Sequence, residues 1–292
     1  MPFTKENARS ILSKVPGIDP QGELSFRYLA DGITNESYWL KLEDQELVLR
    51  INNPDSHRLG LDRDIEATIM KDLVTQTLSP ELIYHDIEQG FQLCTWLSGN
   101  NWTKASLEQT INLNRLAQRL KQLHQLPCNH LPAMDFPKRI DLYRQNIFRR
   151  HGLLPSVEPR LLSLILKVLS TIHHALPRVL CHNDLVAANI IETQDKRQIC
   201  FLDWEYAAVS DPLFELAVIC NGNQLTEAAQ QYLLHAYFGV NTEQYNQAFK
   251  SWCWFYDCLS LYWGLVILPE DIALPDSLLQ DFENQLQLSP LI

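Results

Sequence analysis

The sequence lacks several features that would assign the chain to a class at once. It has no internal repeat, collagen-like stretch or low-complexity segment, which argues against repeat and fibrous architectures. Its seven cysteines form no close Cys-x-x-Cys pair and mostly lie in apolar runs, so we expect reduced core thiols in a cytoplasmic protein rather than a disulfide framework. The N-terminus has no apolar signal core, so no secretion signal is expected.

Basic residues are scarce in the final third of the chain. Residues 182–292 carry 3 basic and 15 acidic side chains, within a net charge of -11. This balance argues against nucleic acid or an anionic membrane surface as a partner and suits a small cationic substrate. Ordinary acidic solubility is the alternative explanation.

Length and composition predict a globular protein of two lobes. At 292 residues, with 46% hydrophobic residues, the chain exceeds the usual size of a single core. The oligomeric state cannot be read from these values.

One loop carries the most specific signal. It reads His-x-Asp-Leu-x-x-x-Asn over His182, Asp184 and Asn189, and an apolar run then ends in Asp203. This spacing is typical of a phosphoryl-transfer catalytic loop with its metal-binding aspartate. We predict that Asp184 takes the proton of an acceptor hydroxyl, with His182 in the same catalytic loop. Asn189 and Asp203 would hold Mg²⁺ against nucleotide phosphates, because hard cations prefer oxygen ligands.

The segment between Asn189 and Asp203 supports this interpretation. Two short β-favouring runs, 190–191 and 199–202, flank the polar residues 193–197 and predict a hairpin. A hairpin would return Asn189 and Asp203 to the same end, where they could share one cation. The alternative is a set of turn residues after a buried strand, and the four positions taken together favour the kinase.

The first part of the chain predicts an antiparallel meander with one inward-facing helix. A short helix over 5–14 precedes strand-like runs at 24–29, 38–42 and 46–51, and a helix follows over 62–73. Thr34 and Asn35 lie in the first turn, where a phosphate-covering loop would lie, although the turn is not Gly-x-Gly-x-x-Gly and an ordinary hairpin turn is the alternative. Arg50 ends the third strand and would contact the nucleotide phosphates. Glu66 would pair with it, unless it belongs to a solvated helix face.

Two further strand-like runs, 82–84 and 91–97, come before Gly-Asn-Asn at 99–101, and we place the lobe boundary between residues 97 and 98. Backbone groups from Thr95 to Leu97 would then meet adenine. The remainder is mainly helical, with helices expected over 106–126, 139–150, 159–175, 213–220 and 226–238. Together these predictions describe an α+β, protein-kinase-like fold. Residues 1–97 would form a small antiparallel-sheet N-lobe, and residues 98–292 a larger helical C-lobe.

Residues 251–268 form a long and nearly apolar run. Asp257 in its middle, the absence of basic flanks and Pro269 argue against membrane insertion and favour a buried helix. Its aromatic residues Trp252, Tyr256 and Trp263 could also wall an acceptor pocket, because ring faces attract desolvated cations. Simple core packing is the alternative.

Taken together, these motifs resemble those of the choline/ethanolamine kinase and aminoglycoside phosphotransferase families, which share the protein-kinase-like fold. The resemblance covers most of the chain, and bacterial choline- and thiamine-kinase-like proteins are the most similar. It rests on Gly-x-Thr-Asn at 32–35, Val-Leu-Arg-Ile at 48–51, Leu-Asp-Arg-x-x-Glu at 61–66, the catalytic loop, and Asp-Trp-Glu-Tyr at 203–206. It implies ATP and Mg²⁺ as cofactors and places Glu205 toward the cationic head of the acceptor. It further implies that Asp211 and Glu215 belong to a segment that steadies the catalytic loop, and we also group Asp211 with the substrate residues.

The late helix departs from the family pattern. Choline kinases carry Trp-Gly-Leu-Trp, whereas this chain has Trp-Gly-Leu-Val at 263–266. A second aromatic wall would have to come from Trp252, Trp254 or Tyr256, which leaves choline, ethanolamine, thiamine or another small cationic alcohol open. We predict transfer of the ATP γ-phosphoryl group to such an alcohol. An aminoglycoside O-phosphotransferase and a nucleotide-binding pseudokinase without turnover are the alternatives.

Overall fold

Contacts divide the chain into two compact units in the computed structural model. One comprises Met1–His57 and Asp62–Gly99, and the other comprises Arg58–Leu61 and Asn100–Ile292. The structure describes residues 3–32, 34–152, 154–172, 176–195, 197–240, 242–269 and 272–291. Ile33 of the predicted phosphate-covering loop and residues 173–175 of a predicted helix lie outside this set.

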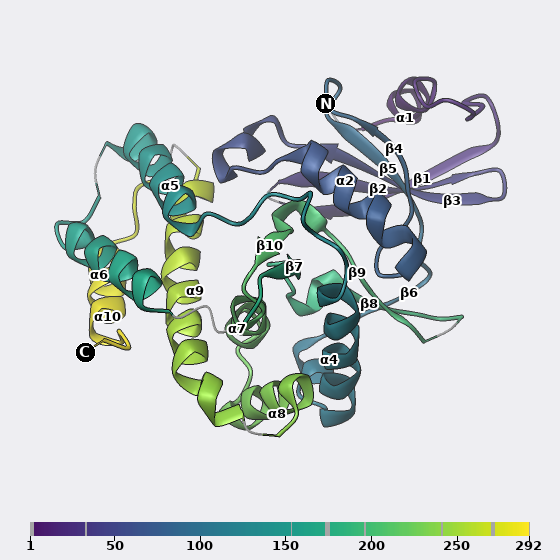
Figure 1. The fold of residues 1–292 in the computed structure, drawn as a ribbon. Helices are drawn as coiled ribbons and strands as arrows, with labels where there is room; N and C mark the ends of the chain where they lie inside the picture. The colour runs from purple at the N-terminus through teal and green to yellow at the C-terminus, as the bar shows by residue number, and fades with distance from the viewer. Residues whose placement is uncertain are drawn as a thin grey trace. The chain divides into compact units, whose positions relative to one another are not determined.

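An antiparallel sheet with the strand order β1-β2-β3-β5-β4 forms the first unit (Figure 1). Its elements are α1 (Lys5–Leu12), β1 (Leu24–Asp31), β2 (Asn35–Leu42), β3 (Gln45–Asn52), α2 (Arg63–Leu73), β4 (Leu82–Asp86) and β5 (Phe91–Thr95). Each predicted strand and helix of this region is present. Short 3₁₀ turns over Pro54–Leu59 and Val74–Gln76 flank α2.

Alternation along the strands gives the sheet two different faces. Leu47 and Leu49 of β3 and Leu93 of β5 pack into one core with Ala8 and Leu12 of α1. Each buried leucine stabilises the fold by about 2 kcal/mol. The intervening residues point the other way, because successive side chains of a strand alternate between faces. Arg50 and its strand partner Gln92 therefore lie on the face opposite that core.

Helices dominate the second unit, which also contains two small sheets. Its helices are α3 (Lys104–Leu107), α4 (Thr110–His124), α5 (Phe136–His151), α6 (Glu158–Thr171), α7 (Pro212–Gly222), α8 (Glu227–Phe238), α9 (Asn246–Ile267) and α10 (Leu278–Gln287). Strands β7 (Val179–Cys181) and β10 (Ala208–Ser210) form one sheet. Strands β6 (Gly99–Asn101), β8 (Ile190–Thr193) and β9 (Ile199–Phe201) form the other.

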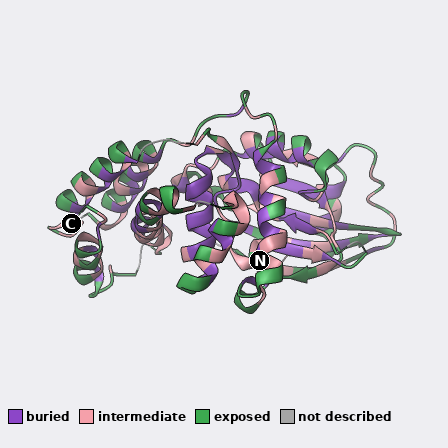
Figure 2. Cartoon of the chain, turned by 60° about the horizontal axis from the view of Figure 1, so that its bottom comes forward, coloured by how far each residue is buried: buried purple, intermediate pink, exposed green. Residues whose placement is uncertain are grey.

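Helix α7 lies at the centre of this unit. Every residue from Pro212 to Cys220 is buried, and the helix packs along α9 (Figure 1). Figure 2 shows helices that are buried along one side and exposed along the other. An all-round apolar helix such as α7 is stable only in a buried position.

Two helix predictions need correction, and one helix was not predicted. The expected helix over 106–126 is divided into α3 and α4, because the extended backbone of Gln109 (φ -84°, ψ 121°) interrupts the helical run. The last long helix, α9, begins at Asn246 rather than near 251. We did not predict α10, a short amphipathic helix that buries Leu278 and Phe282.

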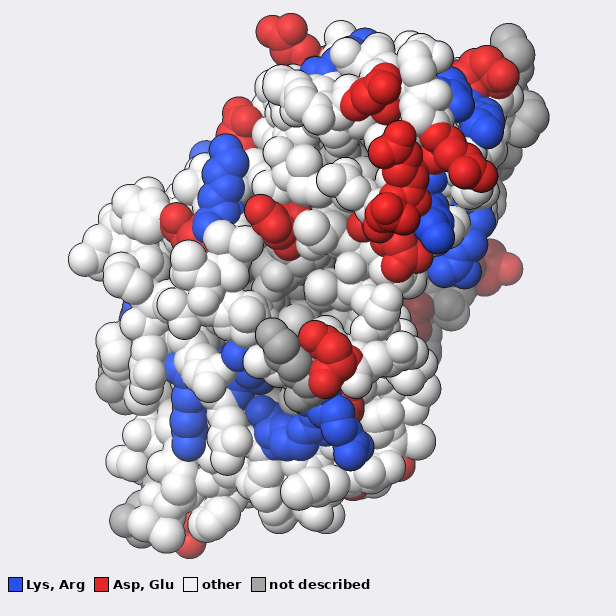
Figure 3. Space-filling view, turned by 90° about the vertical axis from the view of Figure 1, so that its right-hand side faces the viewer, with Lys and Arg blue, Asp and Glu red and all other residues white. Residues whose placement is uncertain are grey.

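Two remaining sequence predictions concern α9 and the cysteines. No helix in the described part of the chain has the length and apolarity needed to cross a membrane. All seven cysteines lie in described residues, and none is paired in a disulfide. On the face drawn in Figure 3, acidic and basic side chains each gather into patches.

Candidate active site

The β8–β9 hairpin brings the two predicted metal ligands to one end, as the sequence predicted. Asn189 immediately precedes β8 and Asp203 follows the residue after β9, and the strands pair antiparallel through Ile190 and Phe201. The Leu202 amide donates to the Asn189 carbonyl at 2.9 Å. Asp203 has a left-handed backbone (φ 62°), a conformation that Asp and Asn tolerate better than most residues.

Asp184 lies at the same end. The Asn189 amide donates to the Asp184 carboxylate at 3.0 Å and to its carbonyl at 2.8 Å, which fixes the catalytic loop against the hairpin. Burial, followed by the negative charges of Asp203 and Glu205, raises the pKa of Asp184 well above its usual range. Three carboxylates therefore gather beside one amide. A divalent cation would relieve their repulsion, and this all-oxygen donor set fits Mg²⁺.

The buried carboxylate of Glu215 holds the catalytic loop in place through hydrogen bonds. Glu215 of α7 accepts the backbone N–H groups of His182 at 2.7 Å and Asn183 at 3.0 Å. Its other oxygen lies 2.6 Å from Nε2 of His124, whose Nδ1 lies 2.6 Å from the Tyr237 hydroxyl. Burial opposes the charge on Glu215, but His124 and the loop amides outweigh it and lower the pKa. The sequence predicted a steadying role for Glu215 by resemblance, and gave His124 only a core position.

His124, Glu215 and Cys181 also form a buried group with metal-ligand chemistry. The 2.6 Å between His124 and Glu215 is a hydrogen-bond distance, and the second Glu215 oxygen already serves the loop amides. The group therefore acts as a hydrogen-bonded anchor.

His182 does not have the catalytic position that we predicted. Its side chain is fully buried, its Nε2 lies 2.8 Å from the Leu202 carbonyl oxygen, and its ring packs against Trp204 at 4.5 Å. His182 therefore holds the catalytic loop to the end of β9 and is a positioning residue. Asn183 adds a second tie, since its left-handed backbone (φ 63°) lets its amide donate to the Tyr206 carbonyl at 3.1 Å.

The C-terminal turn of α7 supports the other side of the loop. Asn223 accepts the Ala187 amide at 2.7 Å and donates to the Leu185 carbonyl at 3.1 Å. At Gly222 a Cβ would lie 2.7 Å from the Tyr256 hydroxyl oxygen and 3.4 Å from Val186. Glycine is needed there so that Tyr256 of α9 can approach the catalytic loop.

The predicted substrate residues divide into two groups. Trp263 donates from Nε1 to the Tyr206 hydroxyl at 2.8 Å, which ties α9 to the Asp-Trp-Glu-Tyr motif. Burial, then the nearby Tyr143 and Glu205, raises the pKa of Tyr206 well above its usual range. Trp263, Tyr256 and Glu205 thus lie near the carboxylates.

Two other residues that we placed with the substrate occupy structural positions. Trp252 is 2% exposed and packs among Phe136, Phe214 and Phe255, so core packing excludes it from the wall of a pocket. Asp211 is buried and caps α7 by accepting the Leu213 amide at 2.8 Å.

Sequence reasoning did not assign a site role to Asp257. This half-buried carboxylate follows Tyr256 on α9, and the Asn221 amide donates to it at 2.9 Å. Burial raises its pKa. No ion pair joins it to a basic residue within the described part of the chain. The signal that could have indicated a site was a lone acid in an apolar helix, which we used only against membrane insertion.

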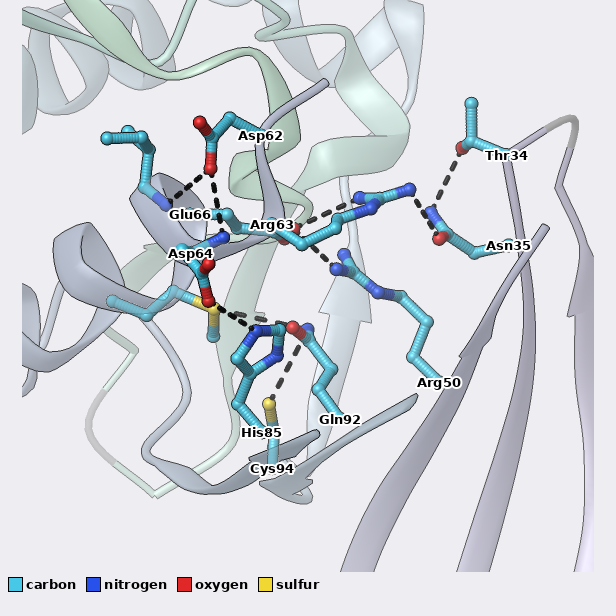
Figure 4. A network of polar contacts seen from close by, with 12 residues as sticks. Thr34, Asn35, Arg50, Asp62, Arg63, Asp64, Glu66, His85, Gln92 and Cys94 are labelled. Atoms are coloured by element: carbon cyan, nitrogen blue, oxygen red, sulfur yellow. Dashed lines mark hydrogen bonds and ion pairs between the residues drawn. The ribbon is translucent and has the colours of Figure 1, made fainter. Parts of the chain in front are cut away.

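The first unit carries the predicted nucleotide residues, and Figure 4 shows Thr34, Asn35, Arg50 and Glu66 among them. Arg50 and Glu66 form the predicted ion pair at 2.5 Å, and both are buried. Arg63, which sequence reasoning named only as part of the Leu-Asp-Arg-x-x-Glu motif at 61–66, joins the same Glu66 oxygen at 3.0 Å. Burial alone would raise the pKa of Glu66, but the two guanidinium groups lower it. Glu66 therefore stays charged.

Thr34 and Asn35 lie beside this ion pair, and Arg63 donates to the Asn35 side chain at 2.9 Å. Thr95 pairs with Glu81 through two hydrogen bonds, which join the ends of β4 and β5. Leu97 follows β5 and is partly exposed. The contact of Thr95 and Leu97 with adenine stays a prediction.

An antiparallel sheet with an inward arginine–glutamate pair, followed by a helical unit with a His-x-Asp loop and an aspartate after a hairpin, defines a kinase-like phosphotransferase. Residues 25–248 match the phosphotransferase enzyme family. The chain belongs to that family.

Named relatives agree with this membership. The chain is 27% identical over 226 residues to protein LicA of Haemophilus influenzae, an alignment that covers 75% of this chain and 64% of that protein. The chain thus spans about two-thirds of the length of that relative. It is 25% identical over 243 residues to ethanolamine kinase 1 of Mus musculus, covering 77% of this chain and 64% of the kinase.

Solved structures show the same fold. The choline kinase LicA of Streptococcus pneumoniae superposes with a TM-score of 0.79 at 18% identity, covering 97% of this chain and 98% of that one. The GDP complex of an aminoglycoside 2'-phosphotransferase-IIIa superposes with a TM-score of 0.66 at 16% identity, and the superposition covers 99% of both chains. The sequence-based assignment of fold and family is therefore confirmed.

Proposed function

We propose that the protein transfers the γ-phosphoryl group of ATP to the hydroxyl of a small cationic alcohol of the choline or ethanolamine type. The observation that carries this proposal is the convergence of Asp184, Asn189 and Asp203 at one end of the β8–β9 hairpin. Supporting it, relatives of the chain are named as a choline kinase and as ethanolamine kinases.

The residues divide the chemistry among them. Asp184 is held by Asn189 and would accept the proton of the acceptor hydroxyl. Asn189 and Asp203 would hold Mg²⁺, which when bound neutralises charge on the nucleotide phosphates. Arg50, kept in place by Glu66, would contact the phosphates with a permanent charge. Catalysis then depends on positioning and charge neutralisation rather than on a covalent intermediate.

The acceptor side suits a cation that carries N–H groups. Glu205 and Asp257 supply carboxylates, and Tyr256 and Trp263 supply aromatic surface. Val266, which replaces the second tryptophan of the choline-kinase motif, is 2% exposed and adds no wall. A carboxylate accepts hydrogen bonds from an amine, whereas a quaternary ammonium ion gains most from aromatic faces. We therefore place ethanolamine-like amines ahead of choline and thiamine.

An aminoglycoside is the second candidate acceptor, because aminoglycoside phosphotransferases share the fold. They superpose less closely than the choline kinase does. A nucleotide-binding protein without turnover is disfavoured, because the sequence contains each polar group that the proposed catalysis needs.

A coupled ADP-release assay tests the proposal with ethanolamine, choline, thiamine and kanamycin as acceptors. Asp184→Ala and Asp203→Ala should abolish turnover, by at least about a thousandfold, while their circular dichroism spectra match the wild type. Asp195→Asn, at an exposed position of the same hairpin, is the control and should retain full activity. Near-normal phosphorylation by either alanine variant would exclude the mechanism, and turnover of kanamycin alone would favour the second candidate.

A further inference from the structure

Three buried side chains of the first unit form a chain of hydrogen bonds with a defined direction (Figure 4). Arg63 donates from Nη2 to Oδ1 of Asn35 at 2.9 Å, and Nδ2 of Asn35 donates to Oγ1 of Thr34 at 3.0 Å. The three residues are 8%, 6% and 7% exposed. Thr34 belongs to the turn that we expect from the sequence to cover the nucleotide phosphates.

The direction of this chain follows from what each group can do. A guanidinium group only donates hydrogen bonds, so Arg63 requires the oxygen of the Asn35 amide to face it. The amide nitrogen is then turned toward Thr34 and donates to the hydroxyl oxygen. A hydroxyl group has one proton, and Thr34 cannot return that proton to a nitrogen that is itself donating. The Thr34 proton is thus left for an acceptor other than Asn35.

Arg63, the first donor in this chain of hydrogen bonds, is held in place by its own contacts. Arg63 is fixed by Glu66 at 3.0 Å, and Glu66 also binds Arg50 at 2.5 Å. Asp62 caps the helix that begins at Arg63, accepting the amides of Asp64 and Ile65. The position of the guanidinium group is therefore set by α2 and the ion pair rather than by the turn.

Backbone hydrogen bonds also hold Thr34, the last residue of this chain of hydrogen bonds. The Asn53 amide donates to the Thr34 carbonyl at 2.8 Å, and the Gly32 amide donates to the Asn35 carbonyl at 2.9 Å. The turn is thus tied to the end of β3, and the Thr34 hydroxyl stays beside the strand that carries Arg50.

We propose that Arg63 is a positioning residue whose hydrogen bond orients the Asn35 amide and thereby commits the Thr34 hydroxyl to donate to a phosphate oxygen of the nucleotide. This inference rests on the proposed function, which supplies the nucleotide. A donor chain that begins at a cation is polarised toward its far end and favours an anionic acceptor. Arg63 and Arg50 then serve the same phosphates in two ways, one through the turn and one by direct contact.

Binding measurements on the full chain with ATP and with adenosine test the proposal, because adenosine lacks the phosphates. Thr34→Val removes the hydroxyl, Arg63→Met removes the first donor, and each should weaken ATP binding about tenfold. Asn35→Asp can accept from Arg63 but cannot donate to Thr34, and should have a similar effect. Adenosine should bind all three variants as tightly as the wild type.

A double-mutant cycle separates the chain from a general loss of charge or structure. Once Thr34→Val has removed the final donor, adding Arg63→Met should weaken ATP binding less than twofold further. Thr34→Ser keeps the hydroxyl and should bind ATP nearly as well as the wild type. Lys71→Met, which removes an exposed positive charge from the same helix, is the control for net charge and should leave ATP affinity unchanged.

Two results would overturn the inference. One is independent, multiplying effects of Thr34→Val and Arg63→Met on ATP affinity. The other is an equal loss of ATP and adenosine binding in Arg63→Met, which would indicate a structural role alone. If the wild-type chain binds no ATP at all, the proposed function fails first and this inference fails with it. If the wild type binds and turns over ATP but the cycle shows no coupling, this inference fails alone.

Discussion

Trp263 of α9 donates a hydrogen bond from its indole nitrogen to the hydroxyl oxygen of Tyr206 at 2.8 Å. The two residues are 57 positions apart, and the contact joins the late aromatic helix to the motif that carries Asp203. A movement of α9 would therefore change the position of Tyr206 beside the carboxylates. The proposed acceptor side and the proposed metal side of the site are therefore physically connected.

Removing this hydrogen bond should affect the acceptor more than the nucleotide. Trp263→Phe keeps an aromatic ring but leaves the partly buried Tyr206 hydroxyl without this donor, at a cost of about 1 kcal/mol. We expect the KM for the acceptor to rise about tenfold while the KM for ATP stays within twofold. Steady-state kinetics with each substrate varied in turn measures both constants. Equal changes in the two constants would contradict the assignment of Trp263 to the acceptor side.

Asp257 should determine how strongly a cationic acceptor binds. Asp257→Asn keeps the shape but removes the charge, so kcat/KM should fall about tenfold for ethanolamine. The decrease should be smaller for choline, which has no N–H group to donate. Asp276→Asn changes the same charge at an exposed position and should have no effect. If Asp257→Asn leaves kcat/KM unchanged, as Asp276→Asn should, then Asp257 does not contribute to binding of the acceptor.

Glu215 should matter to both stability and turnover, because its carboxylate holds two loop amides and His124. Glu215→Gln puts an amide group where one of these hydrogen bonds needs an acceptor. Breaking a buried, charged contact of this kind costs about 3 kcal/mol. Urea denaturation should show that loss, and kcat should fall while the KM for ATP changes little. An unchanged midpoint with unchanged kcat would show that the loop does not depend on this anchor.

The Arg50–Glu66–Arg63 cluster should make the stability of the protein pH-dependent at acidic pH. The pKa of Glu66 is lowered in the folded chain from an ordinary value of 4.5. Above that value both folded and unfolded chains carry the charge, and the stabilisation is complete. As the pH falls, the unfolded chain takes up a proton first, so the stabilisation shrinks until the folded carboxyl is protonated as well.

Glu66→Gln tests this pH dependence. The variant should be less stable than the wild type at neutral pH, and the difference should narrow below about pH 4.5. Urea denaturation between pH 3 and pH 7 gives both free energies of unfolding. A constant difference across that range would show that the charge of Glu66 does not contribute.

Much of the fold could be predicted from the sequence, because its signals are local. Alternating apolar residues indicated the strands of the first unit, and the run from 190 to 202 indicated the β8–β9 hairpin. The convergence of Asn189 and Asp203 followed from that hairpin, since antiparallel strands joined by a short turn return to one end. The division of the 106–126 helix was not predicted, because the apolar periodicity does not show the extended backbone of Gln109 that separates α3 from α4.

Residue types and spacing by themselves determined the family, the catalytic loop and the identity of the carboxylates. Only the tertiary structure decided which polar residues support the site by holding other residues in position. The motif suggested a catalytic role for His182, but its buried side chain holds the catalytic loop in place. Trp252 was expected to line a pocket and is packed in the core. Arg63 and His124 gain their roles from partners 28 and 91 positions away in the sequence. The physical reason is that burial and hydrogen-bond direction depend on which distant groups the fold brings within about 3 Å, and no local pattern encodes that.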